Sequence, residues 1–293
     1  MTRKNKILGL FKISQQINIG KLEEIANVIL KFFDPNEITF NEDRLRKQIY
    51  DYYTLELSEN ISSFYEKKTR ELAGMSREDR ASDPLFTWWS SLKGAMMETA
   101  TRRGWTENDN SPTWLQYELV GRRSSPSSQS YKKYMTFSKL DDDGNLSSKF
   151  YQNYGKLPAL LAEIAKENLS GELTFKIPSH PLVALRHKDS VVIHFKDMND
   201  LEKIEDAIGR VGFDLVSREE VGRTDIGVDS NSSLTGKKSS DSELVAEKAV
   251  ENIKLNKSLL ERLLKNPSTK MEGLSAVNAI LNKVMMESSH RAV

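Results

Sequence analysis

The chain has 293 residues, a formal net charge of +1 and no cysteine. A charge this small does not attract nucleic acid, and the lack of cysteine excludes disulfides, thiolate nucleophiles and cysteine-ligated metals. No apolar run is long enough to span a bilayer. We therefore expect a cytoplasmic protein without nucleic-acid or membrane partners. Export as an effector stays open, because such signals leave little trace in a sequence.

The first third of the chain is predicted to be helical. Apolar residues recur at helical spacing over 20–33, Asp34-Pro35 ends that helix, and Asn41 can cap a second one. Residues 81–114 contain all four tryptophans but show little periodicity, and we expect them to form an aromatic layer on the main core. Residues 1–110 are thus interpreted as a helical N-terminal region.

Residues 111–230 are predicted to form an α+β core. Alternating segments predict strands, and apolar spacing predicts helices, in this order: strands 114–120 and 131–140, helix 157–168, strands 172–177 and 190–196, and helix 201–211. This order favours a mixed, mostly antiparallel sheet with packed helices. The run Asp-Asp-Asp-Gly-Asn at 141–145 lacks the final glutamate of a calcium loop and is interpreted as a hairpin turn.

Residues 231–293 are predicted to contain a linker and C-terminal helices. Residues 229–241 are poor in apolar side chains and are interpreted as a linker or mobile loop. Apolar spacing predicts one amphipathic helix from Leu244 to about Asn266-Pro267, and a last helix around 274–284. The sequence does not decide whether these helices pack on the core or bind a partner.

Positive charge is concentrated at 121–133, where two arginines end one alternating segment and two lysines open the next. These cations are Arg122, Arg123, Lys132 and Lys133. No acidic residue lies between residues 118 and 141, although the chain as a whole is almost neutral. A bound phosphate group is the simplest explanation of this local excess.

Strand parity predicts that further polar residues share one face of the sheet, opposite the apolar core. The residues that parity places on that face are Arg122, Lys132, Tyr134, Thr136, Lys176, His194 and Lys196, with Arg186 and Arg223 near strand ends. Among these cations Lys176 is expected to have a lowered pKa, because like charges and partial burial disfavour its protonated form. A neutral lysine is a general base. An ordinary solvated sheet face is the alternative.

A basic pocket with a lysine base fits β-elimination of phosphate from phosphoserine or phosphothreonine. The lysine would remove the α-proton while guanidinium groups stabilise the charge on the departing phosphate. The reaction needs no metal and no cofactor, and we expect none. His180, His187 and His194 are evenly spaced, but no nearby carboxylate completes a metal-ligand set.

Residues 122–129, Arg-Arg-Ser-Ser-Pro-Ser-Ser-Gln, followed by Lys-Lys-Tyr, resemble the Arg-Arg-x-Ser-Pro-x-Ser-Gln segment of bacterial phosphothreonine lyase effectors. The pattern from Phe175-Lys176-Ile177 through Arg186 to Val192-Ile193-His194-Phe195-Lys196 is also similar to theirs. In order and spacing, residues 115–230 resemble the Hop A-type effectors of plant pathogens. Domains of that family also serve as lyases in lanthipeptide pathways.

The resemblance implies roles for individual residues. Lys176 matches the lysine that abstracts the α-proton, and Lys132 or Lys133 matches a lysine at the start of the central strand. Residues implied to bind phosphate or shape the pocket are Arg122, Arg123, Arg186, Lys196 and Arg223. The lyases carry an acid histidine on the central strand, where this chain has Tyr134-Met135-Thr136. Tyr134 and Thr136 are therefore the candidates there, although a phenol is a weaker acid.

Two hypotheses follow for the function. The first is a lyase that acts on a phosphorylated peptide or protein, either a lanthipeptide precursor or a host protein. The second is a non-catalytic binding module that keeps the phosphate pocket and docks a partner protein through its flanking helices. A kinase acting in the same pathway is a possible partner in both cases.

Overall fold

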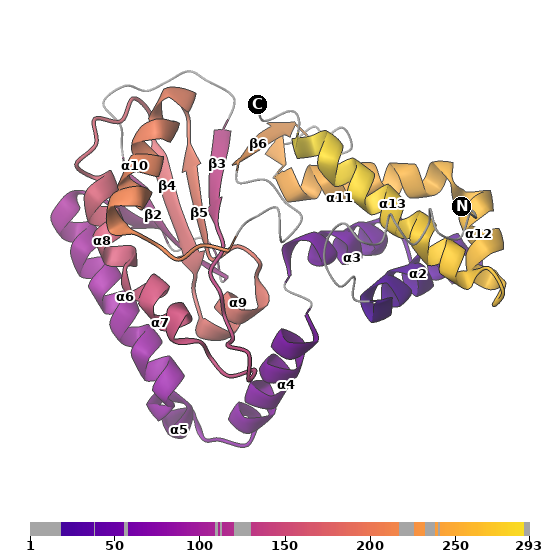
Figure 1. Ribbon diagram of the computed structural model, residues 1–293, viewed down its shortest axis with the longest axis horizontal. Helices are drawn as coiled ribbons and strands as arrows, with labels where there is room; N and C mark the ends of the chain where they lie inside the picture. Colours follow the sequence, from indigo (N-terminus) through magenta and orange to yellow (C-terminus); the bar gives the residue numbers. More distant parts are fainter. Residues whose placement is uncertain are drawn as a thin grey trace, which may run out of the picture.

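The computed structural model describes residues 19–37, 39–55, 58–108, 111, 113–119, 130–216, 226–231, 238–239 and 241–289. Within them the chain has the predicted α+β fold, built on a seven-stranded sheet in the order β1-β2-β4-β5-β3-β6-β7 (Figure 1). Every strand pair in these parts is antiparallel, so the sheet described is antiparallel rather than mixed.

The strands are β1 (Thr106–Asn108), β2 (Trp114–Leu119), β3 (Ser130–Met135), β4 (Leu173–Pro178), β5 (Val191–Phe195), β6 (Ile226–Asn231) and β7 (Lys238–Ser239). The helices of the first half are α2 (Ile19–Phe33), α3 (Glu42–Thr54), α4 (Glu59–Ala73), α5 (Arg77–Ser82) and α6 (Pro84–Arg103). Those of the second half are α7 (Ser148–Gly155), α8 (Leu157–Ile164), α9 (Pro181–Arg186), the short 3-10 helix η1 (Met198–Asp200), α10 (Leu201–Val211), α11 (Asp241–Leu255), α12 (Lys257–Lys265) and α13 (Lys270–Ser289).

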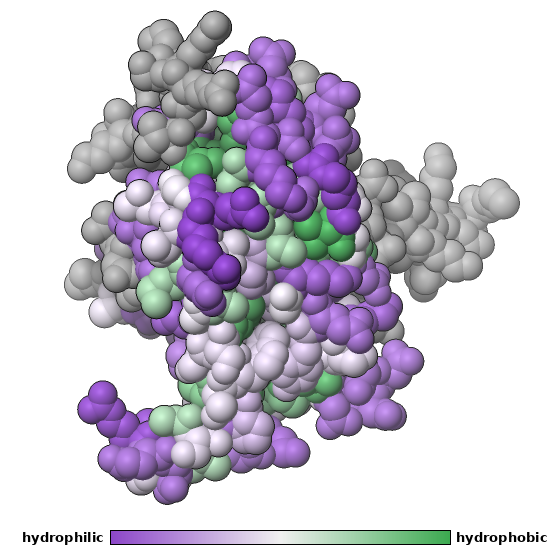
Figure 2. Space-filling view, turned by 90° about the vertical axis from the view of Figure 1, so that its left-hand side faces the viewer, coloured by the Kyte–Doolittle hydropathy of each residue, from purple (hydrophilic) through white to green (hydrophobic). Residues whose placement is uncertain are grey.

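The main hydrophobic core lies between one face of the sheet and a layer of helices formed by α6, α7, α8 and α10 (Figure 1). Alternate residues of β4 and β5 enter this core, as parity predicts; Phe175 and Ile193 are fully buried there. The Nε1 atom of Trp105 donates a hydrogen bond to the carbonyl of Leu161 at 3.2 Å, which ties the end of α6 to α8. Seen from the side of α6 and α8, the surface alternates between hydrophilic and near-neutral residues, with apolar residues in small patches (Figure 2).

Helix α6 lies within the region 1–110 that was predicted to be helical, but its bounds and its buried stripe were not predicted. Asp83 caps its N-terminus by accepting a hydrogen bond from the Leu85 N–H at 3.0 Å, and Gly104 ends it in a left-handed conformation with φ 79°. Its buried residues do recur at helical spacing: Leu85, Trp89, Leu92, Met96 and Ala100. Apolar side chains such as Trp88 and Met97 lie outside that stripe and obscured its period.

A second hydrophobic cluster joins the N-terminal helices α2 and α3 to the C-terminal helices α11, α12 and α13. Ile49 and Ile253 are fully buried in it, and the Tyr53 hydroxyl donates to the carbonyl of Leu281 at 2.8 Å. The C-terminal helices therefore pack against α2 and α3 within the chain (Figure 1). Residues 1–110 therefore contribute helices to both clusters.

Two predictions for the C-terminal part are wrong. Residues 229–241 do not form only a linker, because β6 runs to Asn231 and pairs with β3, and β7 pairs with β6. Ladder hydrogen bonds define these polar strands, so apolar content could not reveal them. The single helix predicted from Leu244 to Asn266 is two, since α11 and α12 are separated at Asn256, whose φ and ψ are −101° and 15°.

The hairpin turn predicted at 141–145 is confirmed. Leu140 and Leu146 form an antiparallel bridge across it, and Gly144 takes a left-handed conformation with φ 77°. The Oδ1 atom of Asp141 accepts hydrogen bonds from the N–H groups of Asp143 and Asn145, at 3.1 and 2.9 Å. The acidic run is thus used as turn chemistry.

Candidate functional site

Cross-strand pairing decides which polar side chains are neighbours on the sheet face opposite the main core. In one row Lys176 of β4 is paired with Val192 of β5, which is paired in turn with Tyr134 of β3. In the next row Thr174 is paired with His194, and His194 with Lys132. Directly opposed Cβ atoms lie about 4.5–5.5 Å apart and diagonal neighbours about 7–8 Å. We call Lys132, Tyr134, Lys176 and His194 the lysine–histidine face.

Burial is uneven across the lysine–histidine face. Lys132 and Tyr134 are each only 5% exposed, whereas Lys176 and His194 are partly exposed. Removing an ammonium group from water is costly unless it meets an anion or several acceptors. From two strand spacings and two residues along the strand, the Cα atoms of Lys132 and Lys176 lie roughly 12 Å apart. Two lysine side chains can meet over that span, so both ammonium groups can reach one ligand between them.

Lys133 lies on the other side of the sheet. Its Nζ atom is 2.7 Å from Oε1 of Glu205 on α10, within the helix layer that covers the core face. Adjacent residues of a strand point to opposite faces. Lys132 therefore shares a face with Lys176, and Lys133 does not.

Thr136 and Arg186 lie outside the two cross-strand rows that form the lysine–histidine face. Thr136 follows the last residue of β3, is 4% exposed, and its carbonyl accepts a hydrogen bond from the Val216 N–H at 3.0 Å. The Arg186 guanidinium, at the end of α9, lies 4.9 Å from the ring centre of Tyr65 on α4. It lines a groove of about 540 Å³ together with Glu24 and other residues of α2 and α4. The structure thus places Arg186 beside helices and Lys176 on the sheet.

Lys196 directly follows β5, on the same parity as His194, and is partly exposed. A Cβ built on Gly171 would lie 3.0 Å from the Cβ of Lys196, so the loop before β4 passes close beside this lysine. A side chain at residue 171 would make Lys196 shift by a few tenths of an ångström, so glycine suits this close approach. The remaining predicted phosphate ligands, Arg122, Arg123 and Arg223, lie outside the described residues.

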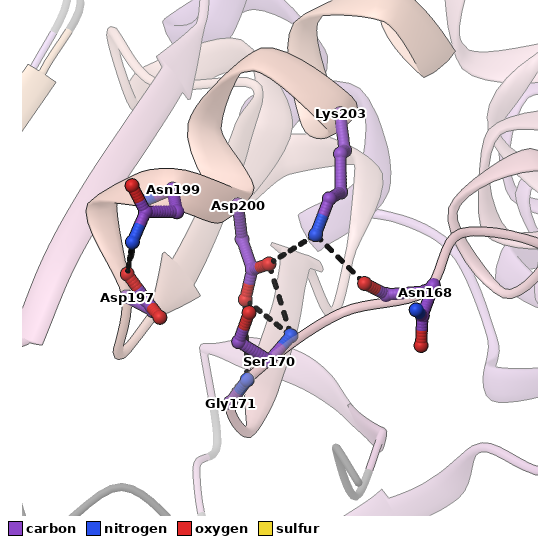
Figure 3. Close-up of polar contacts among 7 residues, drawn as sticks. All are labelled: Asn168, Ser170, Gly171, Asp197, Asn199, Asp200 and Lys203. Carbon is purple, nitrogen blue, oxygen red and sulfur yellow. Dashed lines mark hydrogen bonds and ion pairs between the residues drawn. The ribbon is translucent and has the colours of Figure 1, made fainter. Parts of the chain in front are cut away.

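A buried carboxylate fixes the strand ends near Lys196 (Figure 3). Asp200, which is 1% exposed, accepts hydrogen bonds from the N–H groups of Ser170 at 2.9 Å and Gly171 at 3.1 Å. It also accepts from Lys203 Nζ at 3.0 Å, and that Nζ donates to the carbonyl of Asn168 at 2.7 Å. Since Ser170 precedes β4 and Asp200 follows β5, these contacts hold the two strands in register.

The same contacts determine the charge state of Asp200. Burial alone would raise the pKa of this carboxyl group, but the Ser170 N–H, the Lys203 ammonium and the Gly171 N–H outweigh burial and lower the pKa. Asp200 is therefore ionised at neutral pH. Asp197, three residues earlier, accepts only from Asn199 among the contacts drawn in Figure 3.

A second anchor fixes the opposite ends of β3 and β5. The Oγ atom of Ser190 accepts a hydrogen bond from the Phe137 N–H at 3.0 Å, and the Ser190 N–H donates to the Met135 carbonyl at 2.9 Å. Lys139 is 5% exposed and its Nζ donates to the Leu185 carbonyl at 3.1 Å. With both ends held, the side chains of the lysine–histidine face keep their cross-strand neighbours.

Two histidines have identifiable packing roles. Nδ1 of His180 accepts from the Leu182 N–H at 3.3 Å, and the His180 ring lies 4.7 Å from that of Phe86. The His187 ring lies 5.2 Å from that of Trp114. Burial lowers the pKa of both rings, which keeps them neutral at pH 7. Within the described residues, no group of three or more His, Asp or Glu side chains is placed to hold a metal ion.

Sequence reasoning placed His194 on this face but gave it no role. Its partners became visible only with the strand order, because β3 precedes β4 and β5 in the chain yet pairs with β5 from the other side. Parity showed which way His194 faces, whereas the pairing shows that it lies between Thr174 and Lys132.

No protein-family model matches the chain, and no curated protein resembles it closely enough to count as a match. Among the helices of the described residues, none is long and apolar enough to cross a membrane.

Proposed function

We propose that this chain is a phosphoserine or phosphothreonine lyase of the Hop A-type kind, which eliminates phosphate from a phosphorylated peptide or protein. The observation that carries the proposal is the placement of Lys132, Lys176 and His194 together on one sheet face. The resemblance of residues 115–230 to the lyase effectors is consistent with it and names Lys176 as the base.

The elimination is balanced as follows. Neutral Lys176 takes the proton from the α-carbon of the phosphorylated residue, and that electron pair forms the double bond between the α- and β-carbons. The bond from the β-carbon to the phosphate ester oxygen breaks, and its electrons remain on the phosphate. The products are a dehydroamino acid, a protonated Lys176 and free phosphate. Lys132 stabilises the charge that grows on the departing oxygen.

Burial supports the division of roles between the two lysines. Lys132, at 5% exposure, is placed to hold an anion in a site of low dielectric constant, where charge stabilisation is strong. Lys176 is partly exposed and lies in the row beside it, where an extended peptide can present its α-proton. The basic residues at 122, 123, 196 and 223 are proposed to complete the phosphate pocket.

The test is mass spectrometry of synthetic phosphoserine and phosphothreonine peptides with varied flanking residues, incubated with the full chain. Elimination removes the mass of phosphoric acid from the peptide, whereas hydrolysis removes HPO₃ and leaves a hydroxyl group. Lys176→Ala should reduce the elimination rate at least about 10²–10⁴-fold, the usual contribution of a general base. Its melting temperature should stay close to that of the wild type.

Phosphopeptide binding by the Lys176→Ala variant distinguishes a lyase from the non-catalytic binding module of the second hypothesis. A lyase that has lost its base should still bind a phosphopeptide without consuming it. If the wild type binds phosphopeptides with the same affinity as Lys176→Ala but never changes their mass, the chain is a binding module and the lyase proposal is wrong.

A further inference from the structure

The lysine–histidine face continues across β4 onto β2 and β1. Gln116 of β2 is paired with Lys176, and Glu118 of β2 is paired with Thr174. On the edge strand β1, Asn108 is paired in turn with Gln116. Paired residues of neighbouring strands point to the same side of a sheet. The polar surface beside Lys176 therefore includes two amides and a carboxylate.

The two halves of this surface differ in charge. Lys132 on β3 and Lys196 after β5 are cationic, whereas β1 and β2 contribute amides and the carboxylate of Glu118. Lys176 on β4 lies between the two halves. A phosphorylated residue whose phosphate meets Lys132 and whose α-proton meets Lys176 has its backbone turned toward β2. The residues that flank it then pass over Gln116 and Glu118.

Glu118 is positioned by the edge strand. Its Oε1 atom accepts a hydrogen bond from Asn108 Nδ2 at 2.8 Å, while its Oε2 atom accepts from none of the described residues. The side chain is partly exposed. A carboxylate with one oxygen fixed can accept a charge-assisted hydrogen bond at the other oxygen from a lysine or arginine of a ligand.

The separation of Glu118 and Lys176 determines which residue of a peptide the carboxylate can contact. Glu118 is paired with Thr174, so Lys176, two residues further along β4, is its diagonal neighbour at about 7–8 Å. Side chains on one side of an extended peptide repeat every two residues, or about 6.7 Å. The residue two positions from the phosphorylated one can thus meet Glu118. Glu172, on the same parity as Lys176 but four residues away, lies about 13 Å from it and beyond that position.

We propose that Glu118 determines the substrate specificity of the elimination by selecting phosphopeptides with a lysine or arginine two residues from the phosphorylated serine or threonine. The inference rests on the proposed lyase function. The peptide cation pairs with Glu118 while the phosphate pairs with Lys132, so the two charges bind on opposite sides of Lys176. Two opposite charges held at this spacing orient the α-proton toward the base.

The same pairing affects the protonation of the base. Elimination needs the neutral amine of Lys176, and an unpaired carboxylate one diagonal step away favours its ammonium form. A peptide cation beside Glu118 offsets that carboxylate and favours loss of the proton from Lys176. A matching substrate is therefore bound more tightly and also meets a more reactive base.

A peptide panel and a charge reversal test the specificity. The peptides carry one phosphothreonine, with arginine, alanine or glutamate two residues before or two residues after it. In the wild type, arginine at one of these positions should raise kcat/KM about 5–20-fold over alanine, and glutamate should lower it. Glu118→Lys should reverse the order, so that glutamate at that position gives the faster substrate.

Glu107→Lys is the matched control for the charge reversal. Glu107 lies on β1 and is paired with Tyr117, which is 1% exposed in the main core, so Glu107 points to the other side of the sheet. The same charge change there should leave the order of the peptides unchanged. A reversal in both variants would show an effect of overall charge and would overturn the proposal.

A neutral variant separates recognition from a structural role. Glu118→Gln keeps an oxygen that can accept from Asn108 but loses the charge. It should slow elimination from the arginine peptides about 5–20-fold and leave the alanine peptides at the wild-type rate or faster, because no carboxylate then favours the ammonium form of Lys176. An equal loss on both kinds of peptide contradicts the recognition role.

The outcomes distinguish the lyase function from the role of Glu118. If the wild type eliminates phosphate from none of the peptides, the lyase function and the role of Glu118 are both wrong. If elimination occurs and depends on Lys176, but arginine, alanine and glutamate peptides react at equal rates, only the role of Glu118 is wrong. A preference for arginine that Glu118→Lys reverses and Glu107→Lys retains supports it.

Discussion

Replacing Asp200 by asparagine should lower the stability of the fold by a measurable amount. Asp200→Asn replaces a buried carboxylate that accepts from two backbone N–H groups and from Lys203. Hydrogen bonds to a charged group contribute roughly 1.5–3 kcal/mol each, and asparagine keeps only one acceptor oxygen. The Lys203 contact is partly solvated and counts for less. The free energy of unfolding at neutral pH should therefore fall by about 2–4 kcal/mol.

The stabilisation of the fold by the Asp200 carboxylate depends on pH. The pKa of Asp200 is lowered in the folded state, so its carboxylate stabilises the fold above the unfolded pKa of about 3.9. That contribution disappears as the pH falls through the lowered folded pKa. The difference between the wild type and Asp200→Asn should be constant near neutral pH and should shrink below about pH 4.

Urea denaturation at several pH values measures both quantities. Asp197→Asn is the matched control, since Asp197 is partly exposed and its carboxylate accepts from Asn199 alone among the described contacts. It should cost no more than about 0.5–1 kcal/mol. Equal losses in the two variants, or a difference that persists unchanged below pH 4, would refute the reasoning.

Two further predictions follow from side-chain placement. Lys132→Met should slow elimination about 10²–10³-fold. Lys133→Met, which removes the contact with Glu205 on the core side of the sheet, should change the rate less than about threefold. Steady-state rates on one phosphopeptide measure both, and equal losses would contradict the assignment of the two lysines to opposite faces. Gly273→Ala should lower the free energy of unfolding by about 1–3 kcal/mol. A Cβ at residue 273 would lie 2.7 Å from Leu264 Cδ2 and 3.1 Å from the Leu264 backbone nitrogen, so α12 and α13 would have to move apart. Thermal unfolding measures the effect, and an unchanged melting temperature would show that the two helices separate easily.

Much of the sheet could be predicted because its central strands bury one face. Leu173, Phe175 and Ile177 alternate with Thr174 and Lys176, so parity alone gave both the core and the polar face of β4. The bounds of helix α6 could not be predicted because its aromatic residues are not confined to one side of the helix. The polar strand β6 could not be predicted because it is defined by backbone pairing with β3 and its sequence has no alternating apolar pattern.

The site could be predicted only in part. Parity showed that Lys132, Lys176 and His194 share a face, but not that β5 lies between β3 and β4. Strand order depends on long-range pairing, which no local pattern records. Arg186 is the converse case: its place in the chain suggested the pocket, yet its guanidinium lies over the ring of Tyr65 at the end of a short helix.

The proposed elimination breaks the bond between the β-carbon and the ester oxygen. Turnover of a phosphothreonine peptide in ¹⁸O-labelled water tests it directly, because elimination takes no oxygen from water. We expect unlabelled phosphate together with a dehydroamino acid in the peptide, and neither product from Lys176→Ala. Phosphate carrying one ¹⁸O atom, with threonine restored in the peptide, would show hydrolysis and rule out the lyase function.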